Sequence, residues 1–257
     1  MYGAMHTAQP IVSGGKMLEL DSIDQEKGSI SPILMSELIP GVTLLEFLCR
    51  VEADPDKWLP IPNRLLWLIF QCLVRAVFGM ANPPNRPYGE EQEEPTLEPL
   101  PAKEPTVNDY QIYHGDMHKN NWMFGDLDTG EHTLTPILKL IDFGLARDPS
   151  TFVNQSRTIT QSNIYDIGRL MQSTCGPSDA NSDTELEDLV FECCEPLAVN
   201  RPSLARLWRV IQNALNIKTG PQSFPGKPRA QWETDDMIRQ YVQNFILNGD
   251  DVPVDTW

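Results

Sequence analysis

The sequence predicts an α+β fold in which helices outweigh strands. The strongest helical pattern runs from Pro62 to Met80, where apolar side chains recur at three- and four-residue steps and share one broad face. Between residues 121 and 141, two short apolar runs flank a turn rich in Gly, Asp and Thr, which predicts a β-hairpin. Other helices are expected at residues 43–50, 163–171, 186–194, 204–215 and 234–247, and strands at residues 17–23 and 32–38.

Local signals mark where some of these elements begin and where the pattern is interrupted. Thr43 and Ser203 precede helical patterns and are expected to cap them, because a hydroxyl oxygen can accept a free N–H of the first turn. Residues 82–108 are dense in Pro and Glu. That composition cannot bury enough apolar surface to fold by itself, so we expect an acidic, solvated insertion that folding does not need.

Composition excludes several classes of function. The 257 residues include 20 basic and 36 acidic side chains, for a net charge of −16, which disfavours binding to nucleic acid or to an anionic membrane. The five cysteines show no metal-binding spacing, and the adjacent Cys193 and Cys194 cannot form an unstrained bridge with each other. No run reaches the roughly 18 uninterrupted apolar residues of a membrane span. We therefore expect a soluble, cytoplasmic protein with reduced thiols.

The stretch from His114 to Gly144 carries the residues expected to do chemistry. Asp116 and Asn121 stand five residues apart on a loop, and Asp142 ends the second apolar run of the hairpin. The hairpin should bring Asn121 and Asp142 side by side. A carboxylate that accepts the proton of an attacking hydroxyl, with an amide and a second carboxylate that hold Mg²⁺, is the set of groups used for phosphoryl transfer.

The pattern His-x-Asp-(x)4-Asn followed by Asp-Phe-Gly resembles the catalytic and metal-binding loops of the eukaryotic protein kinase superfamily. The resemblance covers roughly residues 17–216 and implies a protein-kinase-like fold, mainly the helical large lobe with a remnant of the small β lobe. It also implies ATP and Mg²⁺ as cofactors, with Asp116 as the base and with Asn121 and Asp142 as metal ligands.

Other segments extend the resemblance. Residues 37–44 resemble the hinge after the fifth kinase strand, which implies Met35 as gatekeeper and places the adenine edge near the backbone of Glu37 and Leu38. Asn163 stands where kinases carry an Asp that anchors the catalytic loop. The chain would then comprise a small-lobe remnant (1–38), a large lobe (39–216) with the 82–108 insertion, and a linker with a tail helix (217–257).

Several positions depart from the protein kinase pattern. Upstream of the hinge there is no Gly-rich loop and no Lys followed by a helix with a partner Glu. Gly115 replaces the Arg that usually pairs with a phosphorylated loop, and residues 144–163 contain no Glu to pair with Arg201. His118 stands where protein kinases keep a Lys that touches the γ-phosphate. The pattern His-Gly-Asp-x-His is similar to aminoglycoside- and choline-type kinases.

The expected function is transfer of the γ-phosphoryl group of Mg·ATP to a hydroxyl, that of Ser or Thr in a protein. The site residues would be Asp116, His118, Asn121 and Asp142, with His118 contacting the γ-phosphate. One alternative is a pseudokinase or scaffold that is inactive because the small lobe is incomplete. The other is a small-molecule kinase of the aminoglycoside or choline type.

Overall fold

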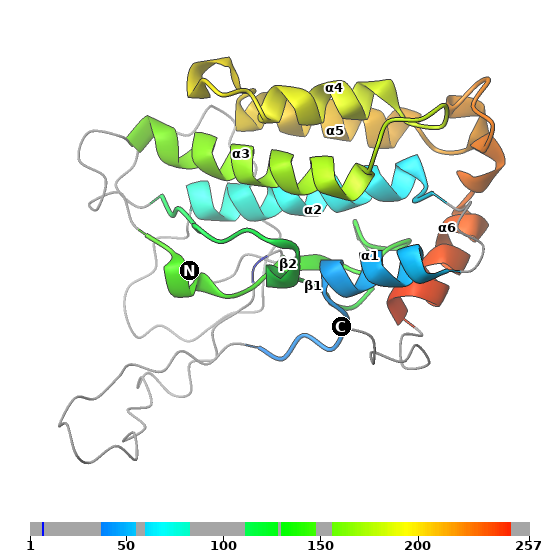
Figure 1. Cartoon of the computed structure of the whole chain (residues 1–257), viewed down its shortest axis with the longest axis horizontal. Helices are drawn as coiled ribbons and strands as arrows, with labels where there is room; N and C mark the ends of the chain where they lie inside the picture. The colour runs from blue at the N-terminus through cyan, green and yellow to red at the C-terminus, as the bar shows by residue number, and fades with distance from the viewer. Residues whose placement is uncertain are drawn as a thin grey trace, which may run out of the picture.

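Helix α2 (Asn63–Ala81) lies at the centre of the fold, with the other elements around it (Figure 1). The computed structural model describes residue 7 and residues 37–54, 60–82, 111–127, 130–147 and 156–247. In these parts α2 contacts α3 (Ser156–Cys175), α5 (Leu204–Ile217) and the strand β2 (Leu138–Leu140). The other main elements are α1 (Leu44–Ala53), β1 (Trp122–Phe124), α4 (Thr184–Cys193) and α6 (Asp235–Val242), which runs into a π-helical turn (Gln243–Leu247). The predicted α+β class is confirmed.

Helix α2 is buried on all sides rather than on the single broad face predicted for it. Every residue of the helix except Leu68 is buried. The reason is its position: the hairpin covers one side, and α3 and α5 cover the other (Figure 1). The helix is long and apolar enough to cross a membrane, but 94% of the apolar window is buried inside the fold, which accounts for its composition.

A buried arginine fastens the hairpin to α2. The Arg75 guanidinium pairs with the carboxylate of Glu131 in the hairpin turn and lies 4.0 Å from the ring centroid of Trp208 on α5. A buried charge is tolerated only when it is paired, so these contacts compensate the desolvation of Arg75. One side chain of α2 thereby holds two elements that are remote in sequence.

The predicted hairpin is confirmed, with strands somewhat shorter than expected. Strands β1 and β2 are antiparallel, with Trp122 opposite Leu140 and Phe124 opposite Leu138. These four side chains are buried, whereas Met123 and Lys139 alternate to the other face. The four buried side chains pack in the core against α2, and Met123 and Lys139 lie on the outer face of the hairpin.

The predicted caps form, but one helix begins earlier than its pattern indicated. Thr43 makes a capping box with Glu46 at the start of α1, and the Ser203 hydroxyl accepts the N–H of Arg206 at the start of α5. Helix α3 begins at Ser156, seven positions before the predicted start at Asn163. The Ser- and Thr-rich first turns lack apolar periodicity, yet Ile159 is buried there, so tertiary packing extends the helix beyond its local signal.

Some expectations fall on parts of the chain that the structure does not describe. These are Met35, the strand at 17–23, most of the strand at 32–38 and nearly all of the 82–108 insertion. Thr7 is described by itself, and it forms a parallel bridge with Leu140 of β2. The five cysteines all lie in described segments, and none is in a disulfide.

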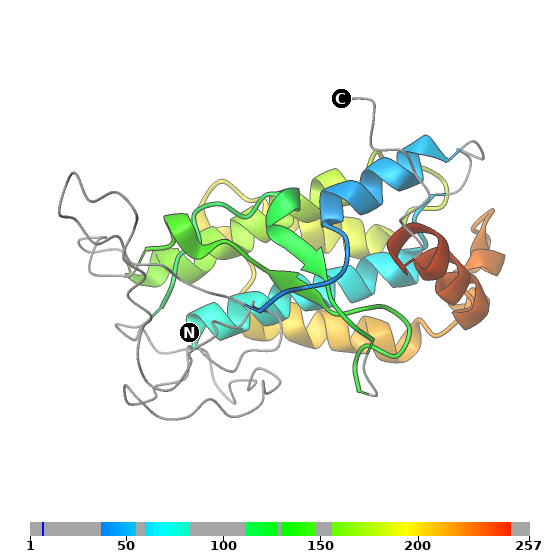
Figure 2. The same ribbon diagram turned by 90° about the horizontal axis from the view of Figure 1, so that it is seen from below.

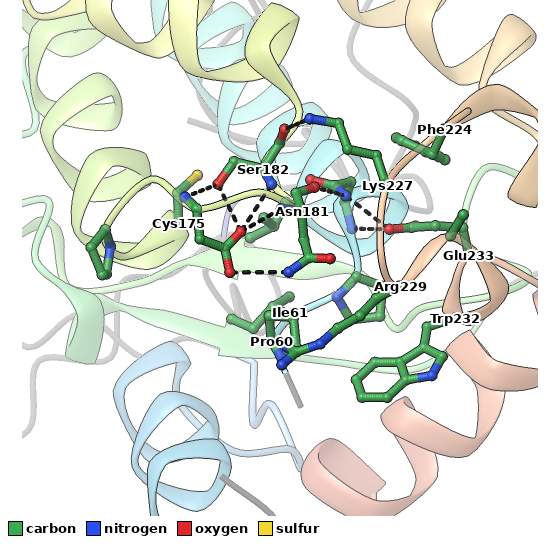
Figure 3. Close-up of a pocket in the computed structure, with 16 residues that line it drawn as sticks. Pro60, Ile61, Cys175, Asn181, Ser182, Phe224, Lys227, Arg229, Trp232 and Glu233 are labelled. Atoms are coloured by element: carbon green, nitrogen blue, oxygen red, sulfur yellow. Dashed lines mark hydrogen bonds between the residues drawn. The ribbon is translucent and has the colours of Figure 1, made fainter. Parts of the chain in front are cut away.

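A hollow lies where the start of α2, the α3–α4 connection and residues 224–233 meet (Figure 3). Its polar groups largely serve one another. Asp179 accepts from the backbone and side chain of Asn181, and the Lys227 ammonium donates to the carbonyl of Ser182, 2.7 Å away. Ile61 and Trp232 contribute apolar surface. The hollow is thus a junction where the C-terminal segment joins the rest of the fold.

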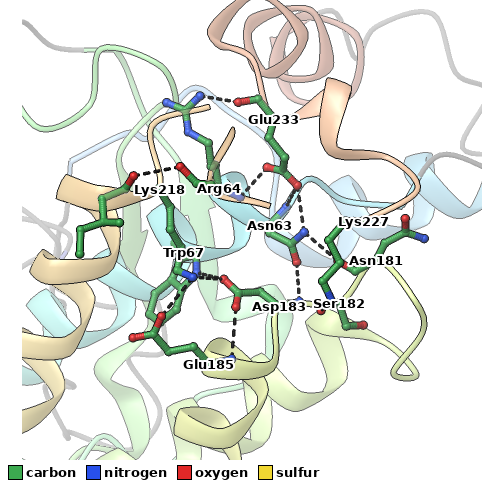
Figure 4. A network of polar contacts seen from close by, with 12 residues as sticks. Asn63, Arg64, Trp67, Asn181, Ser182, Asp183, Glu185, Lys218, Lys227 and Glu233 are labelled. Atoms are coloured by element: carbon green, nitrogen blue, oxygen red, sulfur yellow. Dashed lines mark hydrogen bonds and ion pairs between the residues drawn. The ribbon is translucent and has the colours of Figure 1, made fainter. Parts of the chain in front are cut away.

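The C-terminal segment also caps α2. The Glu233 carboxylate accepts the backbone N–H groups of Asn63 and Arg64, at 2.8 and 3.0 Å, and the side-chain amide of Asn63 (Figure 4). The residue before the helix, Pro62, has no side chain that could do this. Burial raises the pKa of Glu233, and the hydrogen bonds from these donors partly oppose that rise. A remote carboxylate thus supplies the cap and complements the helix dipole.

Loss of this cap should destabilise the protein. We expect Glu233→Ala to lower the free energy of unfolding by about 3 kcal/mol, because two N–H groups of a buried helix end lose their acceptor. Glu233→Gln, which keeps one acceptor oxygen, should lose less. Urea denaturation followed by circular dichroism measures both.

The matched control is Glu192→Ala, which breaks the exposed ion pair with Arg206 and should cost at most about 1 kcal/mol. Equal losses for Glu233→Ala and Glu192→Ala would contradict a capping role for Glu233.

Candidate functional site

His114 fixes the backbone of the loop that carries Asp116. Its ring is fully buried, and Nδ1 lies 3.2 Å from the backbone nitrogen of Asp116, which can only donate. Nδ1 is therefore the acceptor, and Nε2 carries the proton that it donates to the carbonyl of Ile141, 3.0 Å away. Burial lowers the pKa of His114, which keeps the ring neutral. The ring joins the loop to the end of β2.

Asn163 of α3 anchors the same loop from behind, as its position in the sequence predicted. Its Nδ2 donates to the carbonyl of Ile112 at 2.7 Å, and its Oδ1 accepts the N–H of His114 at 3.3 Å. Gly168, one turn further along, allows α4 to approach, because a Cβ there would lie 2.6 Å from that of Cys193. The two positions together seat the loop on a closely packed helix pair.

Asn121 holds the Asp116 carboxylate in place. It ends a 3₁₀ turn (Lys119–Asn121) just before β1, and its Nδ2 lies 2.9 Å from the Asp116 carbonyl and 3.2 Å from Asp116 Oδ2. Both partners are acceptors, so the amide nitrogen must face them. The amide oxygen is then the atom of Asn121 that is suited to a cation.

Asp142 lies beside Asn121 at the end of the hairpin. The backbone N–H of Ile141 donates to the Asn121 carbonyl at 2.9 Å, and Asp142 follows directly. Its backbone is left-handed, with φ 56° and ψ 77°, and its carboxylate accepts the N–H of Gly144. The next ring, Phe143, packs edge-on against His114 with centroids 4.8 Å apart. These contacts hold an exposed carboxylate in a conformation that costs about 1–3 kcal/mol.

His118 lies next to the same carboxylate. Its Nε2 is 3.4 Å from Asp116 Oδ2, and about half of its side chain is exposed. The structure thus brings Asp116, His118 and Asn121 into mutual contact through one carboxylate. Asp142 adjoins them through the backbone pairing of the hairpin.

The segment expected to bind adenine borders the outer edge of β1. The carbonyl of Val42 accepts the N–H of Phe124, and Thr43 bridges Met123. A Cβ at Gly41 would overlap the Phe124 carbonyl, so this approach requires glycine. Glu37 pairs with Lys139 of β2, and the Leu38 side chain is 91% exposed.

Arg201 lacks the Glu partner of protein kinases, but it is not left unsatisfied. Its guanidinium donates to the carbonyls of Glu195, Pro196 and Gln161, at 2.7, 3.0 and 2.8 Å. It also lies 4.7 Å from the ring centroid of Tyr165. Backbone carbonyls and an aromatic face thus take the place of a carboxylate.

The residues present fit a magnesium ion held on a nucleotide. No three His, Cys, Asp or Glu side chains cluster as a metal site within the described segments. Magnesium on a nucleotide needs only one or two protein oxygens, because phosphates and water supply the others. Asn121 and Asp142 can contribute these one or two oxygens. The hollow near Glu233 is a separate place, because no predicted site residue lines it.

Two further residues behind the loop had no signal in the sequence. Asp166 of α3 is hydrogen-bonded to the Tyr113 side chain, and the Tyr113 backbone pairs with Arg147 in both directions. Burial raises the pKa of Asp166 to about 6, which the Tyr113 hydrogen bond and the charge of Arg201 only partly oppose. A polar residue in a helical pattern does not by itself reveal such burial.

No protein-family model matches the chain, and no curated protein matches it. The case for a function therefore depends on the site itself.

The raised pKa of Asp166 predicts a pH-dependent effect on stability. Since the folded pKa exceeds the ordinary 3.8, the native state binds this proton more tightly than the unfolded state, and ionisation at neutral pH costs stability. Asp166→Asn should stabilise the protein by up to about 2–3 kcal/mol at pH 7.5. The gain should shrink as pH falls through 6 towards 4.

Urea denaturation at pH 7.5, 6 and 5 tests this prediction. A loss of stability at pH 7.5 would show that the bonds to the Asp166 carboxylate outweigh the cost of its burial.

Proposed function

We propose that this chain is an ATP-dependent phosphotransferase with a protein-kinase-like fold. The observation that carries the proposal is that three residues expected to be functional, Asp116, Asn121 and Asp142, lie at one end of the hairpin. Asn121 bonds the Asp116 carboxylate, while the Asn121 carbonyl pairs with the residue before Asp142. The match of these contacts to the roles expected from the motif supports the proposal.

Each residue has a role that its contacts favour. The Asp116 carboxylate, which Asn121 orients and whose side chain is 34% exposed, would accept the proton of the attacking hydroxyl. The Asn121 amide oxygen and the Asp142 carboxylate would hold Mg²⁺, and His118 would contact the γ-phosphate. When bound, Mg·ATP supplies the phosphoryl group, and the metal neutralises charge that develops on it. We further propose a cytoplasmic location.

The proposed acceptor is a Ser or Thr hydroxyl of a protein. The identity of His118, which lies beside Asp116, supports one alternative, a small hydroxyl substrate, because a His at this place matches the aminoglycoside- and choline-type pattern. The other alternative is a scaffold that binds nucleotide without catalysis. Residues 1–36 contain no Gly-rich loop and no phosphate-binding Lys before a helix, so we expect slow transfer by these 257 residues alone.

Metal dependence tests the roles of Asn121 and Asp142. We expect Asp142→Asn to weaken Mg·ATP binding at least about tenfold while metal-free ATP binding does not weaken, because the lost charge attracts the ion but repels the phosphates. Titration calorimetry with and without Mg²⁺ measures this. Asp126→Asn, at the opposite end of the same hairpin, is the control and should leave both affinities unchanged. Equal effects of Asp142→Asn on both ligands would refute the metal role.

A second test separates an enzyme from a scaffold. Asp116→Asn keeps a side chain that can contact Asn121 but removes the base. It should lower phosphoryl transfer by about 10²–10⁴-fold with Mg·ATP affinity nearly unchanged. Radiolabelled transfer to a Ser/Thr peptide library and to aminoglycosides and choline measures the rate and identifies the acceptor class. Nucleotide binding by the wild type with no transfer to either class would favour the scaffold.

A further inference from the structure

An ion pair joins the segment expected to bind adenine to the strand that leads to Asp142. The Lys139 ammonium lies 3.0 and 2.9 Å from the two carboxylate oxygens of Glu37. Their side chains are only 13% and 28% exposed. The attraction in a partly buried ion pair is stronger than in one at the surface. Because desolvation of the two charges offsets most of that attraction, the pair adds little stability compared with two apolar side chains. Its main contribution can therefore be to fix the relative positions of the two segments.

The position of Lys139 follows from the pleat of β2. Its neighbours Leu138 and Leu140 point into the core, so Lys139 points to the outer face of the hairpin, opposite Met123. On the far side of β1, Thr43 bridges the same Met123. The segment 37–43 and β2 therefore flank β1 on its two sides, and the backbone of this segment can be followed in Figure 2. The ion pair connects the segment with β2.

The ion pair acts at the start of the segment, while other contacts fix its end. Gly41 and Val42 are held against Phe124 by close backbone approach and a hydrogen bond of 2.9 Å. Residues 38–40 form no helix or strand, and the Leu38 side chain is turned to solvent. The ion pair with Lys139 therefore ties the first residue of the segment directly to the hairpin.

We propose that the Glu37–Lys139 ion pair is a positioning device for the purine base of the nucleotide, an inference that rests on the proposed function. The ion pair sets the distance between the backbone of residues 37–39, which offers N–H and C=O groups to a base edge, and the outer face of the hairpin with Met123. A base recognised by backbone groups requires that they be preorganised. Glu37 and Lys139 act through this backbone and not on the phosphates.

The experiment compares a ligand without phosphates with one that carries them. Binding of adenosine and of Mg·ATP is measured by titration calorimetry for the wild type, Glu37→Gln, Lys139→Met and the charge-swapped double variant Glu37→Lys/Lys139→Glu. We expect each single variant to weaken both ligands by the same factor, about tenfold. The double variant should restore both to within about threefold, which a mere loss of folding would not do.

The control is Glu192→Gln, which removes the charge of an ion pair between α4 and α5 and should change neither affinity. If Lys139→Met weakens Mg·ATP but not adenosine, the lysine acts on phosphate and the positioning role is overturned. Unchanged adenosine affinity in both single variants also overturns it. If the wild type binds neither ligand, the proposed function itself is refuted. If the wild type binds and the variants give either of the two results above, only the positioning role is refuted.

Discussion

The neutral form of His114 is the constraint on which the geometry of the site depends. The ring faces an N–H donor on one side and a carbonyl acceptor on the other, so it must offer one acceptor and one donor. Only the neutral imidazole does so, and a charged ring would turn an N–H towards that of Asp116. Burial, which lowers the pKa of His114, favours the required form. The same desolvation that keeps the ring neutral thus helps to fix the loop that carries the proposed base.

The left-handed backbone at Asp142 depends on that ring as well. Phe143 packs against His114, and Gly144 donates its N–H to the Asp142 carboxylate. Strain of this kind persists only where surrounding contacts over-determine the conformation, and here an aromatic contact and a hydrogen bond do so from two directions. The exposed carboxylate is therefore directed by its neighbours and not by its own preference. Among the described non-glycine residues, Asp142 is the one with positive φ.

The sequence predicts those parts of the fold that depend on neighbours within a few residues. Residue spacing or a motif predicts three features of this kind: the hairpin, the Thr43 cap and the anchoring role of Asn163. The cap supplied by Glu233 was not, because it acts 170 residues away from Asn63 and no local pattern links the two. The role of Lys139 cannot be predicted from the sequence for the same reason, since its partner Glu37 lies 102 residues away and single charges on strands usually face water.

The negative charge around the candidate site indicates that a nucleotide would need a metal ion in order to bind there. The chain carries a net charge of −16, and two of its carboxylates, those of Asp116 and Asp142, lie at the end of the hairpin. Nearby lysines in the described segments are engaged elsewhere: Lys119 donates to the Ser173 carbonyl and Lys139 pairs with Glu37. A triphosphate brought to this surface without compensation would be repelled. Under the proposed function, a divalent cation held by Asn121 and Asp142 would reverse the sign of that interaction, so we expect metal and nucleotide to bind as a unit.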